Sequence, residues 1–232
     1  MYRRDPPLLA SNVTSVSDDA AADTAMFLII GTLRNFNASM TALRRGEWKG
    51  NALQGHDPKR KVLGILGMGG IGQSLKKKAE AFGMSVIYHN RRRLEKETNA
   101  EYVSFEEILK RSDVLSLNLR LNDKTWHMLS TEQFKLMKSS AIIINTARGA
   151  LIDEAALADA LASGLIAGAG LDVFENEPNI HPGLLNNEKT MLLPHLGTLS
   201  LETQENYELW VLDNIRSALT EGKLLSPISL YQ

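Results

Sequence analysis

Three glycines in the sequence have the spacing of a phosphate-binding turn. Gly67, Gly69 and Gly72 form G-x-G-x-x-G within KVLGILGMGGIG, and a helical pattern follows them. The first glycine allows a tight bend, the second lets the backbone approach a pyrophosphate, and the third lets the helix pack on the strand. The free N–H groups at the helix start then face the anion. The flanking strand and helix favour a dinucleotide site that includes Gly70 and Ile71, rather than a glycine-rich turn without a ligand.

The end of the second predicted strand bears on which dinucleotide binds. The strand SVIY, at 85–88, runs into HNRRR, and no carboxylate appears before Glu95. An acidic residue here would bind a ribose 2′-hydroxyl, whereas an arginine accommodates a 2′-phosphate through two hydrogen bonds. We therefore predict that Asn90, Arg91 and Arg92 bind the cofactor, that NADP(H) is preferred and that NAD(H) can also bind. The alternative is that the three arginines form a solvated turn.

Three later segments lie near the ends of predicted strands. They are INTARGALIDE at 144–154, GLDVFENEP at 170–178 and LLPHLGT at 192–198. In this order behind a glycine motif, they resemble the D-isomer-specific 2-hydroxyacid dehydrogenases, a family that includes glyoxylate/hydroxypyruvate reductases and phosphoglycerate dehydrogenases. The resemblance extends from about Ser11 to Pro227 and also rests on DDAAADTAMFLIIGTLR, RRGEW and NIRSALTEGK. Two stretches, YHNRRRL and DDAAADTAMFLI, are similar to the NADP-dependent glyoxylate/hydroxypyruvate reductase branch.

The resemblance implies a role for each polar residue of these segments. It implies that Arg148 binds the carboxylate and carbonyl oxygen of a small 2-oxo acid, and that His195 protonates this oxygen as hydride arrives. Glu177 would pair with His195. Asp172 would lie near the nicotinamide end of the cofactor, and Thr146 would be a further cofactor-binding residue. The residue types suit this chemistry, because guanidinium matches a carboxylate in plane and histidine titrates near neutrality. Taken alone, a histidine after a proline is more often structural.

An alternation of strands and helices must position these residues. The predicted strands lie at 61–66, 85–88, 113–119, 141–145, 165–173 and 190–194. Between them we expect helices at 70–82, after capping boxes at Ser104 and Ser130, and from an N-cap at Asp153 to Ala162. This order predicts an α/β fold, a doubly wound parallel (Rossmann) sheet with helices on both faces. Ligands of such sheets bind beyond the carboxyl ends of the strands.

The remaining parts of the chain flank this sheet. We expect residues 1–17 to be an extended lead-in, 18–198 the dinucleotide-binding domain, and 199–232 a C-terminal helix and tail. A single helix is predicted from Asp18 to about Arg45, because apolar residues recur there at alternating steps of four and three. By resemblance, this helix and Trp48 form a homodimer interface. The alternative is that its apolar stripe covers only its own sheet.

The resemblance also implies a long segment ahead of residue 1. That segment forms most of a flavodoxin-like substrate domain in the family, so we expect this domain to be largely absent and the apolar face of the final helix to be uncovered. Arg120, in LNLRLN, stands where the family commonly has proline and adds a charge near the dinucleotide. Two functions are consistent with these features: a 2-oxo acid reductase, or a dinucleotide-binding module that acts through dimerisation without turnover.

Composition narrows the classes of partner. The 232 residues have a formal net charge of -1, so no global field attracts nucleic acid or an anionic membrane. The absence of cysteine removes disulfides and thiolate catalysis, and no metal site is expected. The apolar stretch at 25–33 is too short to span a bilayer. We expect a cytoplasmic protein whose partners are a small 2-oxo or 2-hydroxy acid and a second copy of itself.

Overall fold

The computed structural model describes residues 10–49, 54–95 and 99–228, and a seven-stranded sheet forms its centre. The strand order is β3-β2-β1-β4-β5-β6-β7, and all neighbouring strands pair in parallel. The strands are β1 (Val62–Leu66), β2 (Ser85–His89), β3 (Glu101–Tyr102), β4 (Val114–Leu117), β5 (Ile142–Asn145), β6 (Gly168–Leu171) and β7 (Thr190–Leu192). The chain therefore winds outward in both directions from β1, which confirms the predicted doubly wound α/β sheet.

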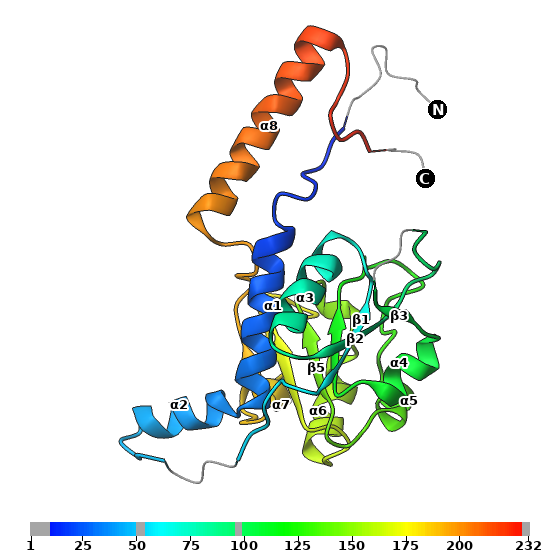
Figure 1. Cartoon of the computed structure of the whole chain (residues 1–232). Coiled ribbons are helices and arrows are strands. Elements are labelled where there is room, and N and C mark those ends of the chain that lie inside the picture. Colours follow the sequence, from blue (N-terminus) through cyan, green and yellow to red (C-terminus); the bar gives the residue numbers. More distant parts are fainter. Residues whose placement is uncertain (1–9, 50–53, 96–98, 229–232) are drawn as a thin grey trace.

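Helices cover both faces of this sheet (Figure 1). The helices on one face are α1 (Asp18–Leu33) and α3 (Gly70–Ala81). The helices on the other are α4 (Phe105–Arg111), α5 (Thr131–Leu136), α6 (Glu154–Ala162) and α7 (Pro182–Leu185). Leu28 and Phe134 are fully buried, one in each of the two resulting cores. Burial of each such side chain contributes about 1.5–3 kcal/mol, so the two cores fix the strand ends from which the site is built.

Capping interactions begin the helices where the sequence predicts. The N–H of Glu107 donates to Ser104 Oγ (3.2 Å), and the N–H of Ser104 donates to Glu107 Oε2 (3.0 Å). The N–H of Ser130 likewise donates to Gln133 Oε1 (3.2 Å). Asp153 caps α6 by accepting the N–H of Ala156 (3.0 Å). These bonds satisfy donors that the first turn of a helix leaves unpaired.

The prediction of a single helix from Asp18 to about Arg45 is wrong. The chain forms α1 and a separate α2 (Phe36–Arg44), because Asn35 between them has a left-handed backbone (φ 52°). The break divides the predicted apolar stripe. Its first part is buried on the sheet: Ala22, Met26, Ile29 and Leu33. Its second part is exposed: Phe36, Met40 and Leu43. Figure 1 shows α2 extending away from the sheet, so only the first part covers the core.

The last helix, α8 (Leu201–Glu221), also extends away from the sheet (Figure 1). The first described residues run beside it: the N–H of Asn12 donates to the carbonyl of Ser226 (3.3 Å), and Trp210 Nε1 donates to the carbonyl of Asn12 (3.3 Å). Residues 1–9 of the expected lead-in lie outside the described residues. The apolar side chains of α8 that are exposed include Val211, Leu212, Ile215 and Leu219. The described chain therefore leaves an apolar face of this helix uncovered, as expected.

Candidate active site

The glycine motif forms a tight turn between β1 and α3. Gly67 has a positive φ (98°), and its N–H donates to the carbonyl of His89 (3.0 Å), at the end of β2. A Cβ at Gly72 would lie 2.5 Å from the carbonyl oxygen of Gly67, so a larger residue would force the helix away from the strand. A Cβ at Gly69, in contrast, would meet nothing within 4 Å. The backbone at Gly69 is therefore open on the side where a ligand could approach.

A cleft of about 620 Å³ opens beside this turn, at the carboxyl ends of β1, β4 and β5. Its walls are Asn12–Ser15 with Ser17 and Asp18, Gly69–Gly72, Asn118–Leu121 and Thr146–Arg148. The fold thus brings Gly69, Gly70, Ile71, Gly72, Thr146 and Arg148 to one cleft. The strand order reverses between β1 and β4, and ligands of doubly wound sheets bind at such a reversal.

Two buried polar atoms in the wall of this cleft have no partner. Among the residues that the structure describes, Asn118 Oδ1 accepts no hydrogen bond, and Thr146 Oγ1 neither donates nor accepts one. Buried polar groups are almost always hydrogen-bonded, so both atoms fit a polar ligand in the cleft. The first residues of α3 line the same cleft, and the unpaired N–H groups at the start of a helix suit an anion. This donor and acceptor set fits a dinucleotide.

Asn90 joins the end of β2 to the glycine turn. Its Oδ1 accepts the N–H of Met68 (2.7 Å), and its carbonyl accepts the hydroxyl of Tyr102 (3.1 Å). An aspartate could accept the same hydrogen bond from Met68. Asparagine at this position accepts the bond without adding a negative charge. Arg91 and Arg92 are exposed beyond Asn90 and do not line the cleft. Neither forms an ion pair within the described part of the chain.

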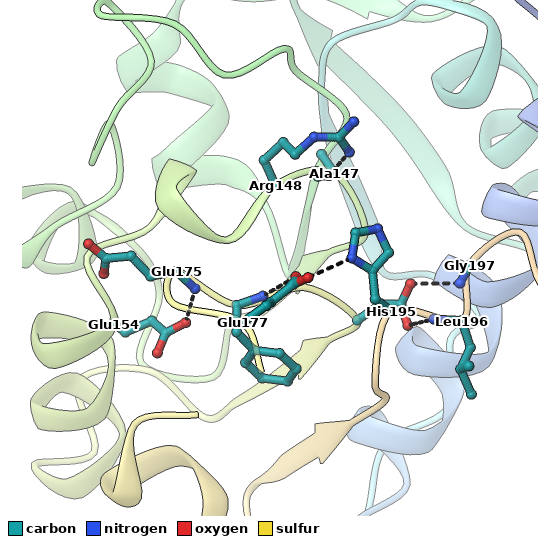
Figure 2. Close-up of polar contacts among 10 residues, drawn as sticks. Ala147, Arg148, Glu154, Glu175, Glu177, His195, Leu196 and Gly197 are labelled. Atoms are coloured by element: carbon teal, nitrogen blue, oxygen red, sulfur yellow. Dashed lines mark hydrogen bonds and ion pairs between the residues drawn. The ribbon is translucent and has the colours of Figure 1, made fainter. Parts of the chain in front are cut away.

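Glu177 and His195 are paired on the neighbouring part of the sheet edge (Figure 2). His195 Nδ1 lies 2.9 Å from Glu177 Oε2, and the N–H of Phe174 donates to Glu177 Oε1 (3.0 Å). Burial alone would raise the pKa of Glu177. The hydrogen bonds from His195 and Phe174 and the positive charges of His195 and Arg148 outweigh burial and hold this pKa below its usual value. Glu177 is therefore a carboxylate beside the imidazole at neutral pH.

Asp172 fixes the backbone that carries this histidine. It accepts the N–H of Leu196 at Oδ1 (2.7 Å) and the N–H of Gly197 at Oδ2 (2.8 Å), and its carbonyl accepts the N–H of His195 (2.8 Å). Burial raises the pKa of Asp172, which is 1% exposed. His195 itself has a left-handed backbone (φ 57°), a conformation that costs about 1–3 kcal/mol and persists only where its surroundings hold it. Asp172 supplies that support.

Arg148 leaves the sheet just after β5. Its side chain is exposed, and Nη1 donates to the carbonyl of Ala147 (2.5 Å). Figure 2 shows the imidazole of His195 pointing toward the side of the site on which Arg148 lies. The glycine turn, Arg148 and the Glu177–His195 pair therefore lie along one edge of the sheet. This edge offers a cation and a proton donor next to a dinucleotide cleft.

Two buried residues that position this site were not singled out from the sequence. Asn145 holds the turn after β5, because its Nδ2 donates to the carbonyl of Arg148 (2.9 Å) and its Oδ1 accepts the N–H of Ala147 (3.0 Å). Glu154, 6% exposed, accepts the N–H of Glu175 (2.5 Å) and so holds the loop that carries Glu177. Two features of the sequence could have identified these residues. Asn145 is a polar residue at the end of an apolar strand, and Glu154 is a second acid directly after the N-cap residue of α6.

Comparisons with known proteins show the family to which the chain is similar. A family model described as "D-isomer specific 2-hydroxyacid dehydrogenase, NAD binding domain" matches residues 26–197. The chain is 53% identical over 224 residues to 4-methyl-2-oxopentanoate reductase A of Aspergillus oryzae, which covers 96% of this chain and 68% of that protein. The chain spans about two thirds of the length of such curated relatives.

Solved structures of similar proteins superpose closely. A glyoxylate reductase from Paecilomyes thermophila has a TM-score of 0.94 and 51% identity, and the match covers 98% of this chain and 70% of that one. An NADPH-dependent glyoxylate/hydroxypyruvate reductase from Sinorhizobium meliloti, in complex with NADP and malonate, has a TM-score of 0.89 and 32% identity. That match covers 96% of this chain and 70% of the other.

Proposed function

This chain belongs to the D-isomer-specific 2-hydroxyacid dehydrogenase family, and we propose that it transfers a hydride between NADP(H) and a small 2-oxo or 2-hydroxy acid. The observation that carries the proposal is the Glu177–His195 pair, which lies with Arg148 on the sheet edge that holds the dinucleotide cleft. The test is NADPH oxidation by the purified chain in the presence of glyoxylate or hydroxypyruvate.

The protein groups have complementary tasks in this reaction. The nicotinamide supplies the hydride when the cofactor is bound. Arg148 binds the substrate carboxylate, because guanidinium and carboxylate match in charge and plane. Hydride addition to the carbonyl carbon leaves a negative oxygen, so the proton on His195 Nε2 moves to this oxygen and completes the 2-hydroxy acid. Glu177 holds Nδ1 of the ring and stabilises the protonated imidazole.

The remaining predicted site residues bind the cofactor or position the acid. Gly67, Gly69, Gly70, Ile71 and Gly72 form the seat of the pyrophosphate. Thr146, whose Oγ1 is buried without a partner among the described residues, offers a hydrogen bond to the bound cofactor. For Asp172 we assign a positioning role, because both of its carboxylate oxygens hold the backbone that follows His195.

We propose NADP(H) as the preferred cofactor. Asn90 places no charge where a 2′-phosphate would lie, and Arg91 and Arg92 follow it with no ion-pair partner in the described ranges. One similar solved structure is described as NADPH-dependent and contains NADP. Small 2-oxo acids are the proposed substrates, since relatives are named as reductases of glyoxylate and of 4-methyl-2-oxopentanoate.

Two further proposals concern organisation. We assign 18–198 to the dinucleotide-binding domain and 199–232 to a helix and tail that pack on a substrate domain. The exposed apolar side chains of α2 and the following turn support a homodimer: Phe36, Met40, Leu43 and Trp48, the last 82% exposed. The alternative function, a binding module without turnover, is not favoured, because the similar curated proteins are named as reductases and dehydrogenases.

A further inference from the structure

The cleft contains a cationic side chain for which the reaction above has no task. Three charged residues line it: Asp18, Arg120 and Arg148. Arg148 has the substrate carboxylate as its proposed partner, and Asp18 belongs to the first turn of α1. Arg120 is exposed, and it forms no ion pair with any residue in the described ranges. Its guanidinium is therefore available to an anionic ligand of the cleft.

The position of Arg120 relative to Arg148 shows which part of a ligand it faces. Leu117 of β4 pairs in register with Asn145 of β5, and each arginine follows its paired residue by three positions. The two arginines thus follow neighbouring strands at equivalent backbone positions. Because β4 lies between β1 and β5, Arg120 stands on the side of the glycine turn and Arg148 on the side of β6.

The segment before Arg120 touches the glycine turn directly. The N–H of Asn118 donates to the carbonyl of Leu66 (2.8 Å), and the carbonyl of Asn118 occupies the space where a Cβ of Gly67 would lie. The backbone of Arg120 is also held, since its carbonyl accepts the hydroxyl of Thr125 (2.8 Å). The side chain therefore starts from a fixed point at the reversal of strand order, next to the turn that receives the pyrophosphate.

We propose that Arg120 binds the pyrophosphate of the dinucleotide, together with the N–H groups at the start of α3. The assignment rests on the proposed cofactor. A second charge in the cleft favours a cation there, because a carboxylate oxygen of Asp18 occupies the position that a Cβ of Gly70 would take, at the start of α3. Without Arg120, this end of the cleft would present a carboxylate to a doubly charged ligand. With Arg120 present, its positive charge offsets the negative charge of Asp18. Its guanidinium can also bind phosphate oxygens in a bidentate manner.

The test compares dinucleotide binding by two variants of the same loop. Arg120→Met removes the guanidinium, and Lys124→Met makes the same change of charge at an exposed residue outside the cleft. NADPH and NADH are titrated against each protein by nicotinamide fluorescence, without substrate. Arg120→Met raises the dissociation constants of NADPH and NADH by the same factor, about tenfold, because both ligands carry the pyrophosphate. Lys124→Met leaves both dissociation constants within about twofold, and Arg120→Lys keeps part of the lost affinity.

Three results would overturn the assignment while the proposed cofactor stands. They are unchanged binding of both dinucleotides by Arg120→Met, a loss confined to NADPH, and a loss shared equally by Lys124→Met. A wild-type chain that binds neither dinucleotide overturns the proposed cofactor and this assignment together. Circular dichroism and the thermal transition of each variant identify a loss of affinity that comes from misfolding, and Arg120→Lys then decides the question.

Discussion

His195 Nδ1 lies 2.9 Å from Glu177 Oε2, while the other oxygen of Glu177 accepts the N–H of Phe174. A backbone hydrogen bond therefore fixes the carboxylate independently of its contact with the imidazole. This arrangement leaves His195 Nε2 as the ring nitrogen that can face a substrate. The pair orients the imidazole so that Nε2 can donate a proton, which is what reduction of a carbonyl group requires.

Glu177→Gln keeps the shape of this side chain and removes its charge. We expect turnover with NADPH and a 2-oxo acid to fall by about a hundredfold, because the imidazolium loses its stabilising partner. The dissociation constant of NADPH stays within about twofold. The matched control is Glu175→Gln, since Glu175 pairs with His127 and not with His195. Equal turnover in the two variants would refute the role of Glu177.

The same substitution has a defined pH signature in unfolding experiments. The pKa of folded Glu177 is below its usual value, so the ionised form contributes stability above the usual glutamate range. This contribution is lost as pH falls through the lowered pKa. The difference in unfolding free energy between wild type and Glu177→Gln is therefore largest near neutrality and shrinks in acid. A difference that grows on acidification would contradict the cited direction of the shift.

Asp172→Asn tests the support of the backbone at His195. The amide can accept only one of the two N–H groups that Asp172 now accepts, so one buried donor loses its partner. We expect a loss of about 1–3 kcal/mol in the free energy of unfolding in urea, and a lower kcat because the His195 segment becomes mobile. The exposed Asp159→Asn on α6 should change neither quantity measurably. Unchanged kcat in Asp172→Asn would show that this bond does not position His195.

Asn90→Asp tests the choice of dinucleotide. Aspartate can still accept the N–H of Met68, so the glycine turn keeps its shape while a negative charge meets the 2′-phosphate. The ratio of NADPH to NADH affinity is expected to fall by at least about tenfold. Asn186→Asp, an exposed site that does not line the cleft, makes the same charge change and should leave the ratio unaltered. A wild-type chain that binds NADH as tightly as NADPH would overturn the proposed preference.

The exposed apolar side of α2 makes the proposed homodimer testable. Met40 and Leu43 are 40% and 56% exposed, so replacing both with lysine removes little packing within one chain. We expect the double variant to elute as a monomer in sizing experiments at concentrations where wild type is a dimer. Leu136→Lys, at another partly exposed apolar position, should leave the dimer intact. A monomeric wild type at micromolar concentration would rule out the interface.

The sequence predicted the sheet and most helix starts because their signals are local. Apolar runs such as IIIN identify buried parallel strands, and Ser104 with Glu107 identifies a capping box. The break at Asn35 was missed because the apolar periodicity continues across it into α2. The two-residue strand β3 was missed because it lies at the edge of the described sheet and pairs there with β2, a contact that residues 101–102 alone do not encode.

The candidate site shows the same division between local and distant information. The glycine spacing and the polar residues after strands could be recognised along the chain, whereas the supporting bonds join distant positions. Glu154 holds the backbone at Glu175, 21 residues away, and Asp172 holds that at Gly197, 25 residues away. The spacing of residues along the chain does not predict such pairs, because the tertiary fold brings their members together.

One measurement tests the central claim most directly: the rate at which the purified chain oxidises NADPH in the presence of glyoxylate or hydroxypyruvate. The proposed function predicts a loss of NADPH absorbance that matches the 2-hydroxy acid formed. It also predicts that His195→Ala removes most turnover while the dissociation constant of NADPH stays within about twofold. Binding of NADPH by the wild type without oxidation, or equal loss of binding and turnover in His195→Ala, would contradict it.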